Sequence, residues 1–398
     1  MTHAVLDTAP KLVVLGFAVR RLGDPTGPGR RAAETETFEN VPDFYTRISS
    51  PRPGQSGAAM KSYAGWGHRM PDYQLMAPFP YFGGKRNAAA VVWEALGDPG
   101  GYIEPFAGSA AVLLGRPPFE GQRMETINDA DGLVINAWRA IKHDPVGVAR
   151  EACWPVSEVD YHARAAWLSG WRADDPIPKL EGNPEWYDTK AAAWWLYVSA
   201  CSIGTGALGG GPWHVTDGRL VKTERSERGI TRQIPHIGGS PKGLLRYHPE
   251  HFGETVEKRT ETYLKRLQAR LIRVRITAGD WTRPLAKSAL SLATTTPHVG
   301  IFLDPPYLTS GDIYHASRNV DQVMLDVLDW CQNADPELRI VLAGYNNDAD
   351  ALLDLGWTKT ESIGGQGNSW SKDPKAGRRE RLWMSPTCHQ AQGSLFDA

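Results

Sequence analysis

The sequence predicts an α/β protein built around a parallel sheet. Short apolar stretches that read as strands alternate along the chain with longer stretches that read as helices. Each predicted strand leads into a turn and then a helix, an order typical of parallel strands joined by helical crossovers. Several of these strands also end on an acidic residue.

The first half of this pattern opens at residues 78–85, an extended approach to a glycine turn. The predicted elements that follow are a helix at 87–96, a strand at 101–104, a helix at 110–114, a strand at 125–127 and a helix at 133–142. The turn at 107–109 contains one glycine, which allows close approach of the backbone without forming a full phosphate cradle.

The second half resumes at Thr255, where Val256, Tyr263, Leu267 and Leu271 fall on one helical face. The predicted elements that follow are strands at 273–277 and 299–303, a helix at 320–332, a strand at 339–343, and a closing pair at 357–363 and 381–384.

The alternation breaks between about Pro145 and His251. Within this stretch only 191–200 reads as a helix, and we expect its Trp194 and Trp195 to pack in a core rather than stack on a base. Residues 201–251 are rich in glycine and are expected to be irregular. Such long loops in compact domains are usually functional or mobile.

Residues 1–75 differ in composition from the rest. From Gly23 to Gly57 they are rich in glycine, proline, serine and charge, which predicts a mostly disordered leader. The alternative is that translation begins at Met60 or Met76.

Composition narrows the class of protein. The chain has 398 residues, 41% of them hydrophobic and 22% charged, with a formal net charge of -1, so a nucleic-acid partner needs a local basic patch. Its 4 cysteines form no CxxC pair and its histidines have no ligand spacing, so neither disulfides nor a metal are expected. No membrane-spanning stretch is present. We expect a cytoplasmic protein of a bacterial cell or a phage-infected host.

Four acidic residues stand at or near predicted strand ends, where ligands of open α/β sheets bind. They are Glu104, Asp129, Asp280 and Asp304. The chain lacks both the G-x-G-x-x-G and the G-x-x-x-x-G-K-[ST] phosphate motifs. The acids therefore favour a ligand with amines and hydroxyls rather than phosphates. The alternative is that they only cap the loops and helices that follow.

The motif Asp304-Pro305-Pro306-Tyr307 follows the predicted strand 299–303. Two prolines restrict φ and remove two backbone donors, so the turn is rigid and its carbonyl oxygens have no competing N–H groups. The Asp304 carboxylate and the Pro305 carbonyl can accept both hydrogens of an amino group, while Tyr307 offers a flat face to a base. The alternative is an ordinary surface turn.

These residues resemble the Dam-like adenine-specific DNA methyltransferases, especially phage-encoded members. Four blocks follow the order of that family: 81–85 (Tyr-Phe-Gly-Gly-Lys), 102–109 (Tyr-Ile-Glu-Pro-Phe-Ala-Gly-Ser), 127–129 followed by the helix 133–142, and 304–307. The resemblance covers roughly 78–385, with further echoes at 279–281, 341–346 and 379–382.

The resemblance implies a Rossmann-like fold that binds S-adenosylmethionine. Lys85 would lie near the methionine carboxylate of this cofactor, Asp129 would accept from its ribose hydroxyls, and Asp280 from its adenine amine. The implied cofactor-binding residues are Tyr81, Lys85, Glu104, Pro105, Phe106, Gly108, Asp129 and Asp280. The implied catalytic residues, which would grip the target adenine, are Asp304, Pro305, Pro306 and Tyr307.

The resemblance also implies a domain plan. Residues 76–145 and 252–386 would form the catalytic domain, 146–251 a mainly helical and irregular inserted target-recognition lobe, and 387–398 a tail. From Pro212 to Arg275 there are 14 Lys or Arg against 7 Asp or Glu, an excess of 14 − 7 = 7 positive charges. Such an excess suits double-stranded DNA. The predicted DNA-binding residues are Arg219, Lys222, Arg225, Arg228 and Arg232.

The expected reaction is methyl transfer from a sulfonium to the amino group of a flipped-out adenine, by a monomer without a metal. It would serve restriction–modification or act alone. Three alternatives remain open. The same chemistry can act on cytosine or on RNA. The chain can be an inactive relative that only binds nucleic acid. It can also be another cofactor enzyme, such as a dehydrogenase, against which the missing glycine fingerprint argues.

Overall fold

The computed structural model describes residues 75–81, 85–119, 123–202, 208, 213–216, 219–222, 255–293, 298–306, 320–360 and 380–389. The chain divides into two compact units, Met1–Trp66 and Gly67–Ala398, and every described residue belongs to the second unit. Apart from Leu75, the predicted leader lies outside the described residues.

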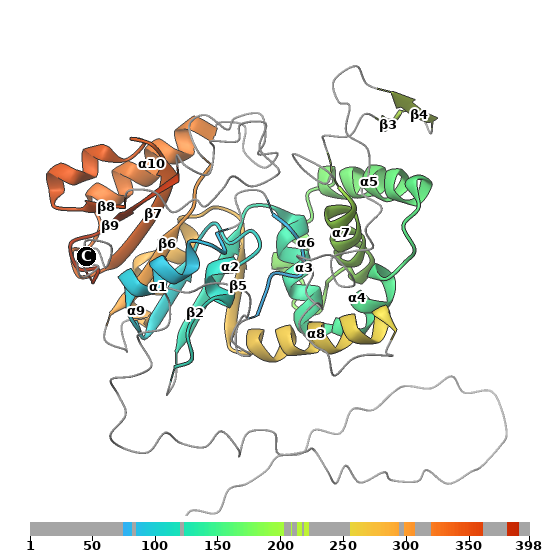
Figure 1. Ribbon diagram of the computed structural model, residues 1–398, viewed down its shortest axis with the longest axis horizontal. Coiled ribbons are helices and arrows are strands. Elements are labelled where there is room, and N and C mark those ends of the chain that lie inside the picture. Colours follow the sequence, from blue (N-terminus) through green and yellow to red (C-terminus); the bar gives the residue numbers. More distant parts are fainter. Residues whose placement is uncertain are drawn as a thin grey trace, which may run out of the picture. The chain divides into compact units, whose positions relative to one another are not determined.

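A seven-stranded sheet forms the centre of the second unit, with the strand order β5-β2-β1-β6-β7-β9-β8 (Figure 1). Its strands are β1 (Gly101–Glu104), β2 (Met124–Asp129), β5 (Val274–Ala278), β6 (Val299–Leu303), β7 (Arg339–Tyr345), β8 (Thr358–Lys359) and β9 (Glu380–Met384). Each strand predicted from the sequence is present, and most have ends within a few residues of the expected ones. The strand expected at 357–363 is represented by the two residues of β8, and 361–363 lie outside the described residues.

The sheet is mostly parallel. Strand β1 pairs in parallel with β2 and β6, β2 with β5, and β6 with β7. Strand β9 runs antiparallel to both β7 and β8. After β1 the chain continues on one side through β2 to β5 and then returns to β6 on the other side, so the strand order reverses between β1 and β6. The predicted α/β class is confirmed, and the sheet is compatible with a Rossmann-like fold.

Two hydrophobic cores lie on the two faces of this sheet, because successive strand side chains point to opposite faces. Tyr102 packs with helices α1, α3, α4, α7 and α8 in one core, whereas the adjacent Ile103 packs with α10 in the other. The same alternation places Phe302 in the first core and Ile301 and Leu303 in the second. Strands β1 and β6 are therefore buried on both sides.

The helices predicted from the sequence are also present. They are α1 (Ala89–Leu96), α2 (Ala111–Leu114), α3 (Gly132–His143), α7 (Thr189–Cys201), α8 (Val256–Leu271) and α10 (Val320–Gln332). Tyr263, Leu267 and Leu271 are buried on α8 as expected, whereas Val256 at its start is only half-buried. Every helix in the described ranges is too short or too polar to pass through a lipid bilayer.

Several further helices were not expected. They are α4 (Pro145–Ala152), α5 (Glu158–Ala173), α6 (Ile177–Gly182) and α9 (Lys287–Ala293), together with the 3-10 helices η2 (Arg283–Leu285) and η3 (Asp350–Leu355). The prolines and glycines in α4, α5 and α6 are residues that usually interrupt helices. Pro145, however, lies in the first turn of α4, where proline is tolerated. Ser157 caps α5 by accepting from the Asp160 amide, a recognisable start signal.

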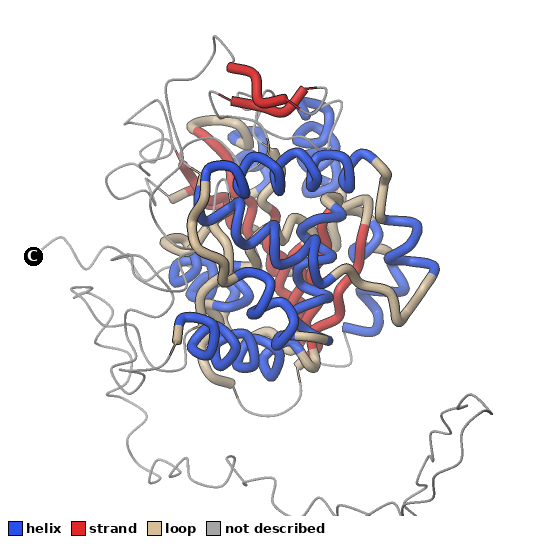
Figure 2. Tube along the Cα trace, turned by 90° about the vertical axis from the view of Figure 1, so that its right-hand side faces the viewer, coloured by secondary structure: helices blue, strands red, loops and turns tan. Residues whose placement is uncertain are grey.

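Helices α4 and α7 share one core with α3 and α8. Figure 2 shows these helices facing the viewer, with the red strands behind them. Trp195 is buried against Phe79, with ring centroids 6.0 Å apart, whereas Trp194 is half-buried against Trp167 at 5.0 Å. Both tryptophans pack against other aromatic rings, as expected.

An antiparallel pair, β3 (Trp213–Thr216) and β4 (Arg219–Lys222), falls inside the stretch that was expected to be irregular. The pairing joins Trp213 to Lys222 and Thr216 to Arg219. The sequence signal is an Asp-Gly dipeptide at 217–218 between two alternating stretches, a pattern typical of hairpins.

Candidate functional site

The sheet brings four carboxylates to its carboxyl edge. Glu104 ends β1, Asp129 ends β2, and Asp304 directly follows β6. Glu380 begins β9, but that strand is antiparallel and pairs with the last residue of β7, so Glu380 lies at the same edge. Three of these residues were predicted, whereas Glu380 was not proposed as a site residue.

Glu104 lies where the strand order reverses, which is the usual ligand position in open α/β sheets. The hydroxyl of Tyr102 donates to its Oε2 at 3.0 Å, and the Leu113 amide donates to the same oxygen at 3.1 Å. Burial, reinforced by the nearby charge of Asp304, raises the pKa of Glu104 to about 8. At neutral pH this carboxyl therefore holds a proton more readily than an exposed one.

Asp129 links two turns of the site. Its Oδ2 accepts from the Gly108 amide at 2.8 Å, and its Oδ1 accepts from the Asp131 amide at 2.8 Å. Burial, together with the charge of Asp131, raises the pKa of Asp129 to about 7. The carboxyl therefore fixes the glycine turn after β1 while remaining at the sheet edge.

Asn128 performs a similar linking role that was not predicted for it. Its side-chain amide donates to the Pro105 carbonyl at 3.1 Å and to the Gly279 carbonyl at 3.0 Å. The ring of Phe106 also stacks on Trp281, with centroids 5.8 Å apart. These contacts join the turn after β1 to the turn after β5.

Tyr81 lies against Gly108, and the Trp138 indole donates to the Gly108 carbonyl at 2.9 Å. The first predicted block therefore does meet the second. Lys85 meets the fourth block instead, because its ammonium forms ion pairs with Asp304 and Glu380. It was expected near a cofactor carboxylate.

Asp280 lies two residues beyond β5 and is exposed. Its Oδ1 accepts from the Thr282 amide at 2.9 Å and from the Thr282 hydroxyl. These contacts agree with the alternative interpretation, in which the acid at this position only caps the turn that follows it.

The proline turn is partly described. Pro305 and Pro306 are buried and Asp304 is half-buried, whereas Tyr307 lies outside the described residues. Of the predicted DNA-binding residues, Arg219 is exposed at the start of β4, and Lys222 ends that strand. Arg225, Arg228 and Arg232 lie outside the described residues.

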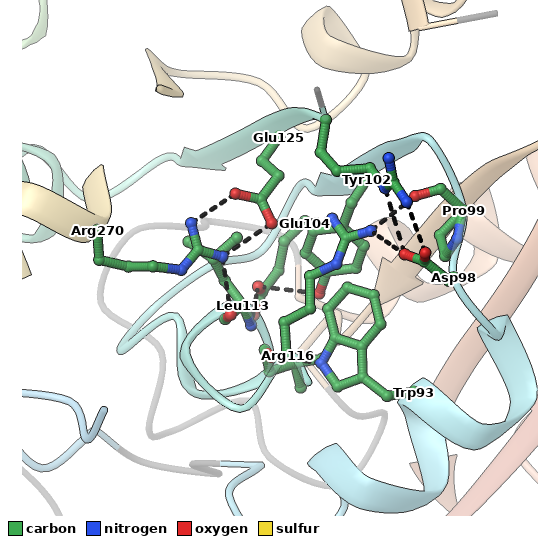
Figure 3. A network of polar contacts seen from close by, with 11 residues as sticks. Trp93, Asp98, Pro99, Tyr102, Glu104, Leu113, Arg116, Glu125 and Arg270 are labelled. Atoms are coloured by element: carbon green, nitrogen blue, oxygen red, sulfur yellow. Dashed lines mark hydrogen bonds and ion pairs between the residues drawn. The ribbon is translucent and has the colours of Figure 1, made fainter. Parts of the chain in front are cut away.

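A charge network centred on the buried side chains of Arg116 and Glu125 lies near Glu104 (Figure 3). Glu125 on β2 accepts from Arg116 at 2.9 Å and from Arg270 at 2.5 and 2.8 Å. Arg116 also donates to Asp98 at 3.0 Å. The charge of Glu125 contributes to the raised pKa of Glu104, so the network and the candidate site are electrostatically coupled.

No group of three or more histidine, cysteine or acidic side chains in the described ranges is arranged to hold a metal ion. No protein-family model matches this chain, and no curated protein matches it.

Proposed function

We propose that the protein is a site-specific DNA methyltransferase that transfers a methyl group from S-adenosylmethionine to the exocyclic amino group of adenine. One observation carries the proposal: the Asp304-Pro305-Pro306 turn follows β6 at the point where the strand order reverses, beside Glu104 at the end of β1. A rigid acceptor for an amine and a buried acceptor for a cation thus lie at neighbouring strand ends. This arrangement suits a Rossmann-like methyltransferase fold.

The residues of this edge fit the proposed cofactor. S-adenosylmethionine has an ammonium, a ribose diol and an adenine amine, but no phosphate. Glu104 and Asp129 are buried carboxyls whose pKa values burial has raised, so a cation or several hydroxyl donors would stabilise their charged forms. Gly108 has a φ of 48°, which suits glycine, and the ring of Tyr81 packs against it, so Tyr81 would line the cofactor site beside this turn.

The chain's own residues would act mainly by orientation. The bound cofactor supplies an electrophilic methyl group, so no covalent nucleophile is needed. Asp304 and the Pro305 carbonyl would accept the two hydrogens of the target amine and hold its nitrogen in line. Pro305 and Pro306 are buried, which keeps the acceptors fixed and limits access of water.

Duplex DNA has to present the base outside its stack, at a cost of a few kcal/mol. Tyr307, for which we propose stacking on that base, would offset part of this cost. Exposed Arg219 on β4 belongs to the segment with excess positive charge, so we propose that this segment contacts the phosphate backbone.

The test is modification mapping of DNA from cells that express the chain or its Asp304→Ala variant. We expect N6-methyladenine in one sequence context with the wild type and none with the variant. Calorimetry should show that the variant still binds S-adenosylmethionine. Unmodified DNA, or a variant with wild-type turnover, would overturn the proposal, and methylation of cytosine or RNA would favour the alternative substrate.

A further inference from the structure

Lys85 bridges two carboxylates at the carboxyl edge of the sheet. Its Nζ lies 2.9 Å from Asp304 Oδ1 and 2.8 Å from Glu380 Oε1. The lysine side chain is only 4% exposed, whereas the carboxylate side chains are 16% and 21% exposed. The ammonium is therefore largely withdrawn from water and lies on the inner side of both acids.

The fold holds the three residues in place. Asp304 follows β6 and Glu380 begins β9, and these two strands flank β7 on opposite sides. Neighbouring strands lie about 4.8 Å apart, so the backbones of the two acids are separated by roughly two such spacings. Lys85 spans this gap from a third segment, where its carbonyl accepts from the Ala88 and Ala89 amides at the start of α1.

The charges explain why such a bridge is needed. Burial raises the pKa of Glu104 to about 8, and the nearby Asp304 contributes to this rise. Glu380 lies at the same edge as Asp304, so a cation between these two carboxylates offsets the repulsion of like charges there. Lys85 supplies that cation. Glu380 in turn gives the buried Lys85 ammonium a second carboxylate partner, which offsets part of the cost of removing that charge from water.

We propose that Lys85 and Glu380 are positioning residues, which fix the orientation of the Asp304 carboxylate for the amine that it accepts. This role rests on the proposed methyltransferase function. It differs from the role expected from the sequence, in which Lys85 binds the cofactor's carboxylate. That carboxylate would be a third anion around Lys85, in addition to Asp304 and Glu380. In this proposal Glu380 acts on Asp304 through Lys85, so its contribution to kcat should disappear when the lysine is absent.

A double-mutant cycle tests this dependence. It compares the wild type with Lys85→Met, Glu380→Gln and the double variant, measuring kcat, KM for DNA, the Kd for S-adenosylmethionine and the melting temperature. We expect Lys85→Met to lower kcat by about 10²-fold, the order of loss that a small misplacement of a reacting group causes. The Kd for S-adenosylmethionine should stay unchanged. Glu380→Gln should lower kcat less, and the double variant should match Lys85→Met.

Two further variants serve as controls. Lys85→Arg keeps a cation and should recover part of the lost kcat. Lys359→Met removes a comparable lysine, which pairs with Asp350 at 2.7 Å on the edge strand β8 away from Asp304, and should leave kcat unchanged. If Lys85→Met melts too low for assay, Glu380→Gln and Lys85→Arg still carry the test, because lower kcat with unchanged cofactor affinity is expected of both.

Two results would overturn the positioning role. One is a weakened Kd for S-adenosylmethionine in Lys85→Met with kcat unchanged at saturating cofactor, which would make Lys85 a cofactor ligand. The other is additive losses in the double variant, which would mean that Glu380 acts independently of Lys85. A wild type that transfers no methyl group to any DNA would instead reject the proposed function itself.

Discussion

Gly108 lies directly beneath the ring of Tyr81. A β-carbon added at Gly108 would come within 2.5 Å of Tyr81 Cδ1, closer than non-bonded atoms approach, and the glycine has a φ of 48°. Both facts require glycine at this turn, because L side chains rarely adopt such a conformation. The turn after β1 is thus held by a close contact between the Gly108 backbone and the Tyr81 ring.

We expect Gly108→Ala to destabilise the protein and to weaken binding of S-adenosylmethionine. The added methyl group strains the backbone and displaces the Tyr81 ring, which together should cost about 1–3 kcal/mol. Urea denaturation measures the stability, and calorimetry measures the Kd for the cofactor.

A matched control is Gly170→Ala in α5. An added β-carbon there meets nothing within 4 Å, so the substitution should stabilise the helix by about 0.5–1 kcal/mol and leave binding unchanged. Equal behaviour of the two variants would show that the turn at Gly108 tolerates a side chain.

Glu104 should make the stability of the protein depend on pH. Its pKa is about 8 in the folded protein and that of an ordinary glutamate when unfolded, so the folded state holds this proton more tightly. The contribution of Glu104 to stability therefore falls as pH rises from about 4.5 to about 8 and is constant above that range. Glu104→Gln removes this titration while its amide oxygen can still accept from Tyr102 and Leu113.

The measurement is urea denaturation of wild type and Glu104→Gln at pH 5 and pH 9. One pKa unit corresponds to about 1.4 kcal/mol. The free energy of unfolding of the variant relative to that of the wild type should therefore be at least ~2 kcal/mol higher at pH 9 than at pH 5. Titrating groups that the two proteins share contribute equally to both free energies of unfolding, so they cancel in this comparison. A stability difference that is the same at both pH values would show that Glu104 titrates normally.

Local patterns explain why most of the sheet could be predicted. The strands at 101–104 and 299–303 have the expected bounds, because a short apolar stretch that follows turn-forming residues and ends at an acidic residue is a signal within a few residues. The acids at strand ends came together because parallel strands share one carboxyl edge. Period-two alternation of the strand also accounts for the packing of Tyr102 and Ile103 on opposite faces of the sheet.

The pairing of side chains could not be predicted in this way. Lys85 and Glu380 lie near opposite ends of the described chain, and only the insertion of antiparallel β9 beside β7 brings them together. Asp280 has the residue type and position of a ligand, yet the contacts shown are with Thr282. In the inserted region, the Ser157 cap of α5 was a usable signal hidden among prolines and glycines.

We expect deletion of residues 1–66, the first compact unit, to leave both folding and methyl transfer in place. The boundary matters, because Leu75 packs on the core and the hydroxyl of Tyr263 contacts both the amide and the carbonyl of Met76, at 2.5 and 2.7 Å. Deletion of the whole predicted leader, 1–75, should keep activity with slightly lower stability. The melting temperature and turnover of both truncations check this, and loss of cofactor binding in the shorter deletion would refute it.

Arg116 should contribute far more to stability than a surface cation does. It is buried and joins Glu125 to Asp98 and to the Pro99 carbonyl, so Arg116→Met leaves a buried carboxylate with less compensation. Breaking a buried pair costs about 3–5 kcal/mol, and the lower end is expected because Arg270 still contacts Glu125.

Lys265→Gln breaks an exposed pair with Glu261 on α8 and should cost about 0.5 kcal/mol. Urea denaturation of both variants gives the comparison, and similar losses would mean that the network of Figure 3 is no more stabilising than a solvated pair.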